Sequence, residues 1–172
     1  MNIHNNFWSE EVLSLLRGKI SDYKKNNLSL MLQSNRWAQD IVRDSALILI
    51  HSLSYDELEP IARDVSKVYD TGSFNDLWSR IYFWQKGSYI PWHTDGDYKF
   101  VGSTYLNDFD WDYSWGGAGL YKNEDGSINA YFPTYNTLIA QYGDGNCSQY
   151  HGTSILSPSA PVRITLQTFG RK

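Results

Sequence analysis

The second half of the sequence consists of short runs rich in aromatic and β-branched residues, separated by Gly, Asn, Asp and Pro. Such runs predict β-strands, because these side chains fit a pleated surface and the turn residues end each run. So many short strands in one stretch of chain predict a sandwich or barrel, and a jelly roll is its natural form. We expect eight strands, at residues 78–85, 89–93, 99–106, 118–122, 128–132, 137–142, 149–155 and 162–169.

The first third of the sequence shows helical periodicity instead. Ser9 is a suitable helix cap, and a second helix is predicted to begin near Ser54. Between them, residues 28–32 alternate like a short strand. The apolar residues behind the two caps recur at helical spacing: Val12, Leu15, Leu16 and Ile20 in the first helix, and Leu58, Ile61, Val65 and Val68 in the second.

We therefore predict a mainly β fold with N-terminal helices, in one domain over residues 1–172. A helical buttress (1–77) would support a jelly-roll, or double-stranded β-helix, catalytic core (78–172). A chain of 172 residues suits one hydrophobic core. Its 15 Lys and Arg against 19 Asp and Glu give a net charge of −4, which lacks the basic footprint of a general nucleic-acid binder.

Nothing in the sequence indicates a membrane span or a secretory signal. The longest aliphatic run, residues 46–50, is far shorter than the ~20 residues that cross a bilayer. The N-terminus lacks the basic and apolar regions of a signal peptide, so we expect a cytoplasmic protein with no membrane partner. The single cysteine, Cys147, excludes an intrachain disulfide and a cysteine-based zinc site, and we expect it to be a packing residue.

A candidate metal site comes from two of the four histidines. His93 and Asp95 are two residues apart in a predicted strand, so their side chains leave the same face. His151 lies in another predicted strand. Two imidazoles and one carboxylate on one side of a metal leave three positions open, as in non-haem Fe(II) oxygenases. The His-x-Asp pattern alone is weak, since about 0.4 matches are expected by chance, and a strand histidine beside a turn acid is the alternative.

Arg163 strengthens the metal interpretation. It follows His151 by twelve residues and opens the last predicted strand. A guanidinium buried in a barrel needs an anionic partner, and a dicarboxylate cosubstrate would supply one in bidentate geometry. The alternative is a solvent-facing arginine at the end of a strand.

In this order and spacing the sequence resembles the 2-oxoglutarate/Fe(II)-dependent dioxygenases, specifically their prolyl 4-hydroxylase-like branch. The resemblance covers roughly residues 80–170, a little over half of the chain. Many prolyl hydroxylases have lysine where this chain has Arg163. The matching segments are 87–95 (GSYIPWHTD), 105–107 (YLN) with 116–117 (GG), 133–139 (PTYNTLI) ahead of His151, and the strand led by Arg163.

The resemblance implies a role for each matching residue. His93, Asp95 and His151 would hold Fe(II), to which 2-oxoglutarate and O2 would bind as cosubstrates. Arg163 would pair with the distal carboxylate of 2-oxoglutarate, and the Tyr105 hydroxyl would donate a second hydrogen bond to it. No catalytic residue beyond the metal ligands is implied. A prolyl residue in a protein or peptide would be hydroxylated with release of succinate and CO2, and ascorbate is a candidate reductant.

Further residues are weaker candidates. Tyr82 and Trp84, on the strand ahead of the metal motif, are possible pocket residues that share a face with Arg80. Trp92 should point away from the metal and pack in the core. The acidic, aromatic loop 107–115 could be a substrate-binding lip and loop 69–76 a lid, although both also fit ordinary connections.

Two other functions stay open. The same chemistry could act on a free amino acid, another small molecule or a nucleobase. The nucleobase branch ranks lower, because Arg171 is eight residues from Arg163, farther than that branch's arginine pair. The chain could also be a non-catalytic, cupin-like metal-binding module, against which the retained Arg163 argues. The sequence does not indicate an oligomeric state.

Overall fold

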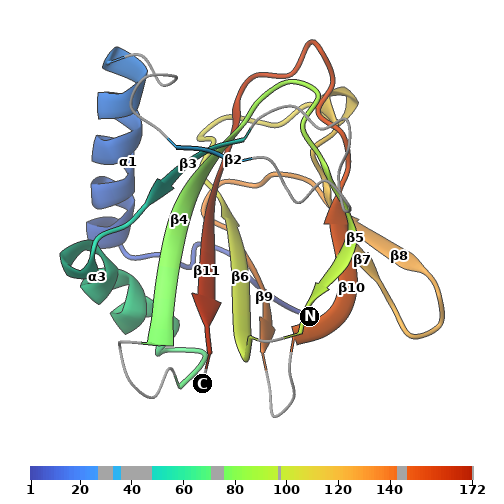
Figure 1. Cartoon of the computed structure of the whole chain (residues 1–172), viewed down its shortest axis with the longest axis horizontal. Helices are drawn as coiled ribbons and strands as arrows, with labels where there is room; N and C mark the ends of the chain where they lie inside the picture. The colour runs from blue at the N-terminus through green and yellow to red at the C-terminus, as the bar shows by residue number, and fades with distance from the viewer. Residues whose placement is uncertain (27–32, 36–47, 71–75, 97, 143–146, 172) are drawn as a thin grey trace.

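Two antiparallel β-sheets face each other in the computed structural model, and helices α1 and α3 cover the outer face of the larger sheet (Figure 1). The structure describes residues 1–26, 33–35, 48–70, 76–96, 98–142 and 147–171. In chain order the elements are β1 (Asn2–His4), α1 (Glu10–Lys25), β2 (Gln33–Asn35), β3 (Ile48–Ser52), α3 (Tyr55–Val65), β4 (Leu77–Trp84), β5 (Ile90–Asp95), β6 (Phe100–Tyr105), the 3-10 turn η2 (Tyr113–Trp115), β7 (Gly119–Lys122), β8 (Ile128–Tyr131), β9 (Leu138–Tyr142), β10 (Cys147–Thr153) and β11 (Arg163–Gly170).

The larger sheet has the strand order β1-β9-β6-β11-β4-β3-β2, and the smaller sheet has the order β5-β10-β7-β8. Most neighbours in each sheet are distant in the sequence, because the chain crosses repeatedly from one sheet to the other. This arrangement is the double-stranded β-helix predicted from the sequence. All eight predicted strands are present, with ends shifted by one or two residues at most.

The helices pack an apolar stripe against the larger sheet. The Ser9 hydroxyl caps α1, and Ser54 and Glu57 form a capping box at the start of α3. Between these helices and the sheet lies the main hydrophobic core, in which Leu16, Ile61 and Phe83 are fully buried. The helices therefore cover the outer face of the larger sheet, and the inner face is left to face the smaller sheet.

Strand β4 divides its side chains between these two faces. Leu77, Ile81 and Phe83 belong to the core under the helices. The alternate residues Trp78, Arg80, Tyr82 and Trp84 line a cavity between the two sheets, as the period of two in a strand requires. The cavity therefore has a wall made by one face of the larger sheet.

The first 77 residues contribute more than helices. Strands β1, β2 and β3 extend the larger sheet at its two ends, and none of them was among the predicted strands. Strand β3 begins in the aliphatic run, at Ile48, and pairs antiparallel with β4. The strand expected at residues 28–32 lies outside the described residues. In the described part of the chain, no helix has the length and apolar character needed to cross a membrane.

Trp92 corrects one expectation. It points away from the cavity as predicted, but it is not in the core: 37% of it is exposed, and its ring stacks on Tyr150. Neither of the described helices α1 and α3 lies over this outer face of the smaller sheet (Figure 1). An outward side chain on this sheet therefore stays at the surface. Cys147, in contrast, is buried as expected.

Candidate metal centre and cosubstrate pocket

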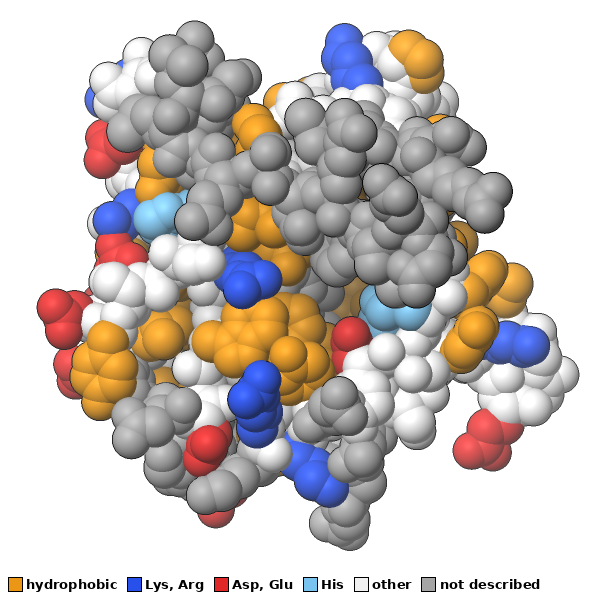
Figure 2. All heavy atoms as spheres, viewed as in Figure 1, with side chains coloured by type: hydrophobic (Ala, Val, Ile, Leu, Met, Phe, Trp, Pro, Cys, Tyr) orange, Lys and Arg blue, Asp and Glu red, His pale blue; other side chains and the backbone are white. Residues whose placement is uncertain are grey.

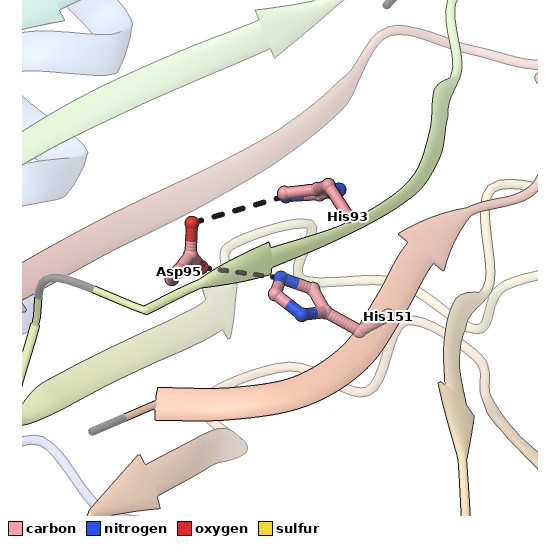
Figure 3. A group of neighbouring side chains, drawn as sticks. All are labelled: His93, Asp95 and His151. Atoms are coloured by element: carbon pink, nitrogen blue, oxygen red, sulfur yellow. Dashed lines mark ion pairs between the residues drawn. The ribbon is translucent and has the colours of Figure 1, made fainter.

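Two neighbouring strands of the smaller sheet bring His93, Asp95 and His151 together. His93 and Asp95 lie on β5, and His151 lies opposite His93 on β10. One ligand atom from each residue lies within 4.8 Å of the others. Figure 3 shows the three side chains converging, with the Nε2 atoms of His151 and His93 at 3.2 and 3.9 Å from the Asp95 carboxylate. The structure thus assembles all three predicted ligands.

Backbone carbonyls fix the orientation of the imidazole rings of His93 and His151. The Nδ1 atom of His93 lies 2.9 Å from the Pro91 oxygen, and that of His151 lies 2.9 Å from the Gln149 oxygen. A carbonyl only accepts hydrogen bonds, so both Nδ1 atoms carry the proton. In the neutral form of each ring, the Nε2 atom is then left with a lone pair directed into the triad, whereas protonated His151 donates from Nε2 to Asp95. The neutral form has the tautomer and orientation in which histidines bind metals.

The two histidines differ in their electrostatic surroundings. Burial, together with the neighbouring His151, lowers the pKa of His93. Burial also disfavours the protonated form of His151, but the hydrogen bond and charge of Asp95 outweigh it and raise the pKa of His151. One imidazole is therefore held neutral, and the other attracts a positive charge that a metal ion could supply instead.

Arg163, at the start of β11, faces this triad from the larger sheet. It is 2% exposed, and its Nε and Nη1 atoms have no hydrogen-bond partner among the described residues. Its guanidinium carbon lies 4.5 Å from the centroid of the Trp84 ring and 5.0 Å from that of Tyr105. Burial lowers the pKa of this guanidinium, opposed by the nearby Tyr105 hydroxyl. A buried, unpaired cation of this kind is costly without an anionic ligand.

Tyr105 and Trp84 hold Arg163 from both sides. The Trp84 indole N–H donates to the Thr165 hydroxyl at 2.9 Å, which fixes that ring. The Tyr105 hydroxyl donates to the Tyr131 carbonyl at 3.1 Å. Tyr105 therefore lies beside the guanidinium, with its proton directed to the backbone.

The triad and Arg163 line one cavity of about 350 Å³. Tyr82 and Trp84, the two predicted pocket residues, belong to its wall. Figure 2 shows hydrophobic side chains at the centre of this face, between the sheets, with basic side chains bordering them and acidic and histidine side chains beside them. The full lining is Trp78, Arg80, Tyr82, Trp84, Ile90, His93, Thr94, Asp95, Tyr98, Val101, Ser103, Tyr105, Gly119, Tyr121, Ile139, Gln141, His151, Gly152, Thr153, Arg163, Gln167 and Phe169.

Sequence reasoning missed two residues of this site. The buried Tyr121 stacks on His151, with ring centroids 5.6 Å apart, and burial raises its pKa. The Gln141 side-chain nitrogen lies 3.4 Å from His151 Nδ1. Both lie on predicted strands, and their alternation with core residues was the available signal. This alternation does not reveal which strands become neighbours, so it could not predict that Tyr121 and Gln141 would lie beside His151.

The two loops singled out from the sequence have different outcomes. In loop 107–115, Trp111 is buried and its indole N–H donates to the Gly116 carbonyl at 2.9 Å, whereas Phe109 and Tyr113 are exposed. This loop lines a second cavity on the surface rather than the one that holds the triad. Most of loop 69–76 lies outside the described residues.

No protein-family model and no curated protein matches this sequence. Solved structures do match. A prolyl-4-hydroxylase from Pseudomonas putida has a TM-score of 0.71 at 13% identity, covering 99% of this chain and 91% of that one. A prolyl hydroxylase from Trichoplax adhaerens, in complex with a hypoxia inducible factor oxygen degradation domain peptide fragment, has a TM-score of 0.75 at 12% identity, covering 99% and 82%.

A third structure extends the likeness beyond prolyl hydroxylases. An oxidoreductase of the 2OG-Fe(II) oxygenase family from Burkholderia pseudomallei has a TM-score of 0.57 at 18% identity, covering 96% of this chain and 93% of that one. At these identities the likeness is one of fold. This chain shares the double-stranded β-helix fold of the prolyl hydroxylases and of a 2-oxoglutarate/Fe(II) oxygenase.

Proposed function

We propose that this protein is an Fe(II)- and 2-oxoglutarate-dependent dioxygenase. One observation carries the proposal: a His-Asp-His triad and a buried, unpaired arginine line the same cavity from opposite sheets. The triad alone would also fit a protein that only binds a metal, and the arginine alone would also fit one that only binds an anion. Together they match what a metal-bound dicarboxylate requires, a cation at one end and a metal with open positions at the other.

His93, Asp95 and His151 are the residues that would hold the iron. Neutral imidazoles and a carboxylate suit Fe(II), and three protein ligands leave room for the other reactants. The Nδ1–H bonds to backbone carbonyls would keep both rings oriented with or without metal. When bound, Fe(II) and 2-oxoglutarate would supply the oxidising chemistry that places an oxygen atom of O2 into a C–H bond, with succinate and CO2 released.

Arg163 would anchor the distal carboxylate of 2-oxoglutarate. Its buried Nε and Nη1 atoms have no hydrogen-bond partner among the described residues, so each has an N–H group to donate to that carboxylate. The rings of Trp84 and Tyr105 hold the guanidinium in place and exclude water from the pair. The Tyr105 hydroxyl would reach the same carboxylate by turning from the Tyr131 carbonyl. Desolvation strengthens each of these contacts.

We propose a prolyl residue in a protein or peptide as the group that is hydroxylated. The likeness to two prolyl hydroxylases, one of them bound to a peptide, favours this substrate. Aromatic side chains on the cavity wall, including Tyr82 and Trp78, suit the flat apolar face of a proline ring. Ascorbate would serve as a reductant. A free amino acid is the alternative substrate, because its carboxylate would suit the second cationic side chain in the cavity, Arg80.

An anaerobic titration tests the metal and cosubstrate. Fe(II) and then 2-oxoglutarate are added to metal-free protein, and the visible charge-transfer band of the chelate is recorded. We expect a band that needs both additions and is absent from His93→Ala. His4→Ala is the matched control, because His4 bonds to Tyr142 and does not line the cavity, so the band should stay intact.

The outcome separates enzyme from binding module. A band followed by succinate release and a gain of one oxygen on a proline-containing peptide would support the full proposal. If folded, iron-loaded protein gives no band, the open positions are not accessible to a keto acid, and a cupin-like metal-binding module becomes the better interpretation.

A further inference from the structure

The cavity holds a second arginine, which the proposed chemistry does not use. Arg80 is half-buried on β4 and lines the same cavity as the triad and Arg163. Its guanidinium carbon lies 4.5 Å from the centroid of the Trp78 ring. The Trp78 ring in turn stacks on Phe169, at 4.0 Å and 16°. The Arg80 guanidinium therefore packs against a pair of stacked aromatic rings, which restricts its position.

No acidic side chain among the described residues is a partner of Arg80. Among the described residues it forms no ion pair with any carboxylate. Of the described residues that line the cavity, Asp95 is the one with an acidic side chain, and it belongs to the triad. Tyr82, next but one along β4, is a neutral neighbour, and burial raises its pKa, opposed by the adjacent Arg80 charge. The Tyr82 hydroxyl accepts a hydrogen bond from Arg80, but a neutral hydroxyl does not neutralise the guanidinium, so its charge is available to an anionic ligand.

The sum of the charges in the loaded site indicates what kind of ligand Arg80 would bind. In the loaded site, the divalent metal with Asp95 keeps one positive charge, and Arg163 adds another. The two carboxylates of 2-oxoglutarate neutralise these two charges. The charge of Arg80 is then left without a counter-charge among the described lining residues, although the chain as a whole carries a net charge of −4. Electrostatic complementarity calls for one more anion, which must come from the substrate.

We propose that Arg80 is a substrate-binding residue that pairs with a carboxylate of the molecule to be hydroxylated. The inference rests on the proposed function and specifies its substrate class. The planar guanidinium on Trp78 would present two parallel N–H groups to the carboxylate, while Trp78 and Tyr98 offer apolar walls to the rest of the ligand. The carboxylate can come from a free amino acid or from an acidic side chain near the target residue of a peptide.

A binding experiment tests Arg80 without knowledge of the natural substrate. The protein is loaded with saturating 2-oxoglutarate and Zn(II), a redox-inert substitute, so that Arg163 is already occupied. 4-Fluorobenzoate and its neutral analogue 4-fluorobenzamide are then titrated and followed by fluorine NMR. Arg80→Gln removes the charge and keeps a polar side chain, and Arg80→Lys keeps the charge. Arg171→Gln is the matched control, because Arg171 lies over Tyr98 but does not line the cavity.

We expect wild-type protein to bind the benzoate and not the benzamide. Arg80→Gln should weaken benzoate binding at least about tenfold, as loss of a charge-assisted pair does; Arg80→Lys should recover part of it, and Arg171→Gln should bind like wild type. Equal binding of both probes, no binding of either, or equal loss in Arg80→Gln and Arg171→Gln would overturn the proposal. Thermal melts of each variant check that the fold is intact.

Turnover distinguishes the two sources of the carboxylate. Succinate release is measured with free L-amino acids, including proline, and with the same amino acids as amides. It is also measured with proline-containing peptides that carry Glu or Gln beside the proline. Preference for the free acids or for the Glu peptides identifies the source, and that preference should disappear in Arg80→Gln. Failure of the iron and 2-oxoglutarate band in wild type is the separate result that rejects the proposed function itself.

Discussion

The side-chain oxygen of Asn107 accepts a hydrogen bond from the backbone N–H of Ile164 at 2.8 Å. The same amide donates to the Val162 carbonyl at 2.9 Å. Asn107 therefore holds the backbone on both sides of Arg163, and it is itself buried. The position of Arg163 on β11 thus depends on Asn107, a residue that follows a different strand, β6.

Asn107→Ala should destabilise the protein and weaken cosubstrate binding. Two buried backbone groups lose their partner, which costs about 1–3 kcal/mol per unsatisfied group. Urea unfolding measures the stability, and titration of 2-oxoglutarate into the metal-loaded protein measures the binding. Asn129→Ala is the control, because Asn129 is exposed on the outer strand β8 and bonds only within the hairpin. Unchanged 2-oxoglutarate affinity in Asn107→Ala would separate Asn107 from the position of Arg163.

Arg163→Gln should weaken 2-oxoglutarate binding by at least about a hundredfold, because charge-assisted bidentate pairing in a desolvated site is worth a few kcal/mol. Metal binding should stay intact, since the triad lies on the other sheet. Isothermal titration with 2-oxoglutarate, on Zn(II)-loaded protein, measures the effect. Arg171→Gln serves as the exposed-arginine control. Normal affinity in Arg163→Gln would show that the anchor is another residue.

Gly117→Ala should be far more harmful than Gly126→Ala. Both glycines have positive φ, 71° and 85°, so alanine strains the backbone at either site. At Gly117 an added Cβ would also lie 2.8 Å from Leu156 Cδ2 and 3.1 Å from Arg163 Cδ, whereas nothing lies within 4 Å at Gly126. Melting temperatures measure the strain and 2-oxoglutarate titration the displacement of Arg163. Equal effects of the two substitutions on both readouts would contradict the close packing at Gly117.

Asp64 should make the fold sensitive to acid. Burial disfavours its charge, but hydrogen bonds from Lys67, at 2.5 Å, and from the Ser9 N–H, at 2.8 Å, outweigh burial and lower its pKa. The unfolded chain therefore takes up this proton at a higher pH than the folded protein. The stabilisation is complete above the ordinary Asp value of about 3.9 and is lost as the pH falls through the lowered pKa.

Urea unfolding at several pH values below about 5 tests this expectation. Asp64→Asn should be less stable than wild type at neutral pH, and its stability should fall less steeply on acidification. Glu59→Gln, an exposed substitution on the same helix, should keep the wild-type slope. Parallel slopes for wild type and Asp64→Asn would rule out Asp64 as the source of the acid sensitivity.

The parts of the fold that could be predicted are those whose residue pattern repeats within a short stretch of sequence. Alternating side chains and turn residues identified the strands of both sheets, and helix caps identified α1 and α3. Strand β3 was missed because an aliphatic run alone has no period of two, and it becomes a strand only by pairing with β4. Strand β1 is three residues long and exists through its pairing with β9. Long-range pairing of this kind leaves no local signal.

The candidate site divides in the same way. His93 and Asp95 are close in sequence, so their shared face could be predicted. His151 and Arg163 were candidates from their residue types and their places in predicted strands, and the family resemblance gave each a role. The contacts of Asn107 and the lack of an acidic partner for Arg80 among the described residues could not be predicted. Both depend on which strands become neighbours and on which acidic groups are near, and these are properties of the assembled sheets.

The metal triad and the arginine anchor stand on opposite sheets, which has a consequence for selectivity. In the proposed function, the distance between them is set by how the two sheets pack and not by the length of any flexible side chain. The site then selects the cosubstrate by the distance between its keto-acid end and its distal carboxylate. A keto diacid one carbon shorter or longer could reach the metal or Arg163 but not satisfy both, so discrimination among cellular keto acids would follow from the spacing of the sheets.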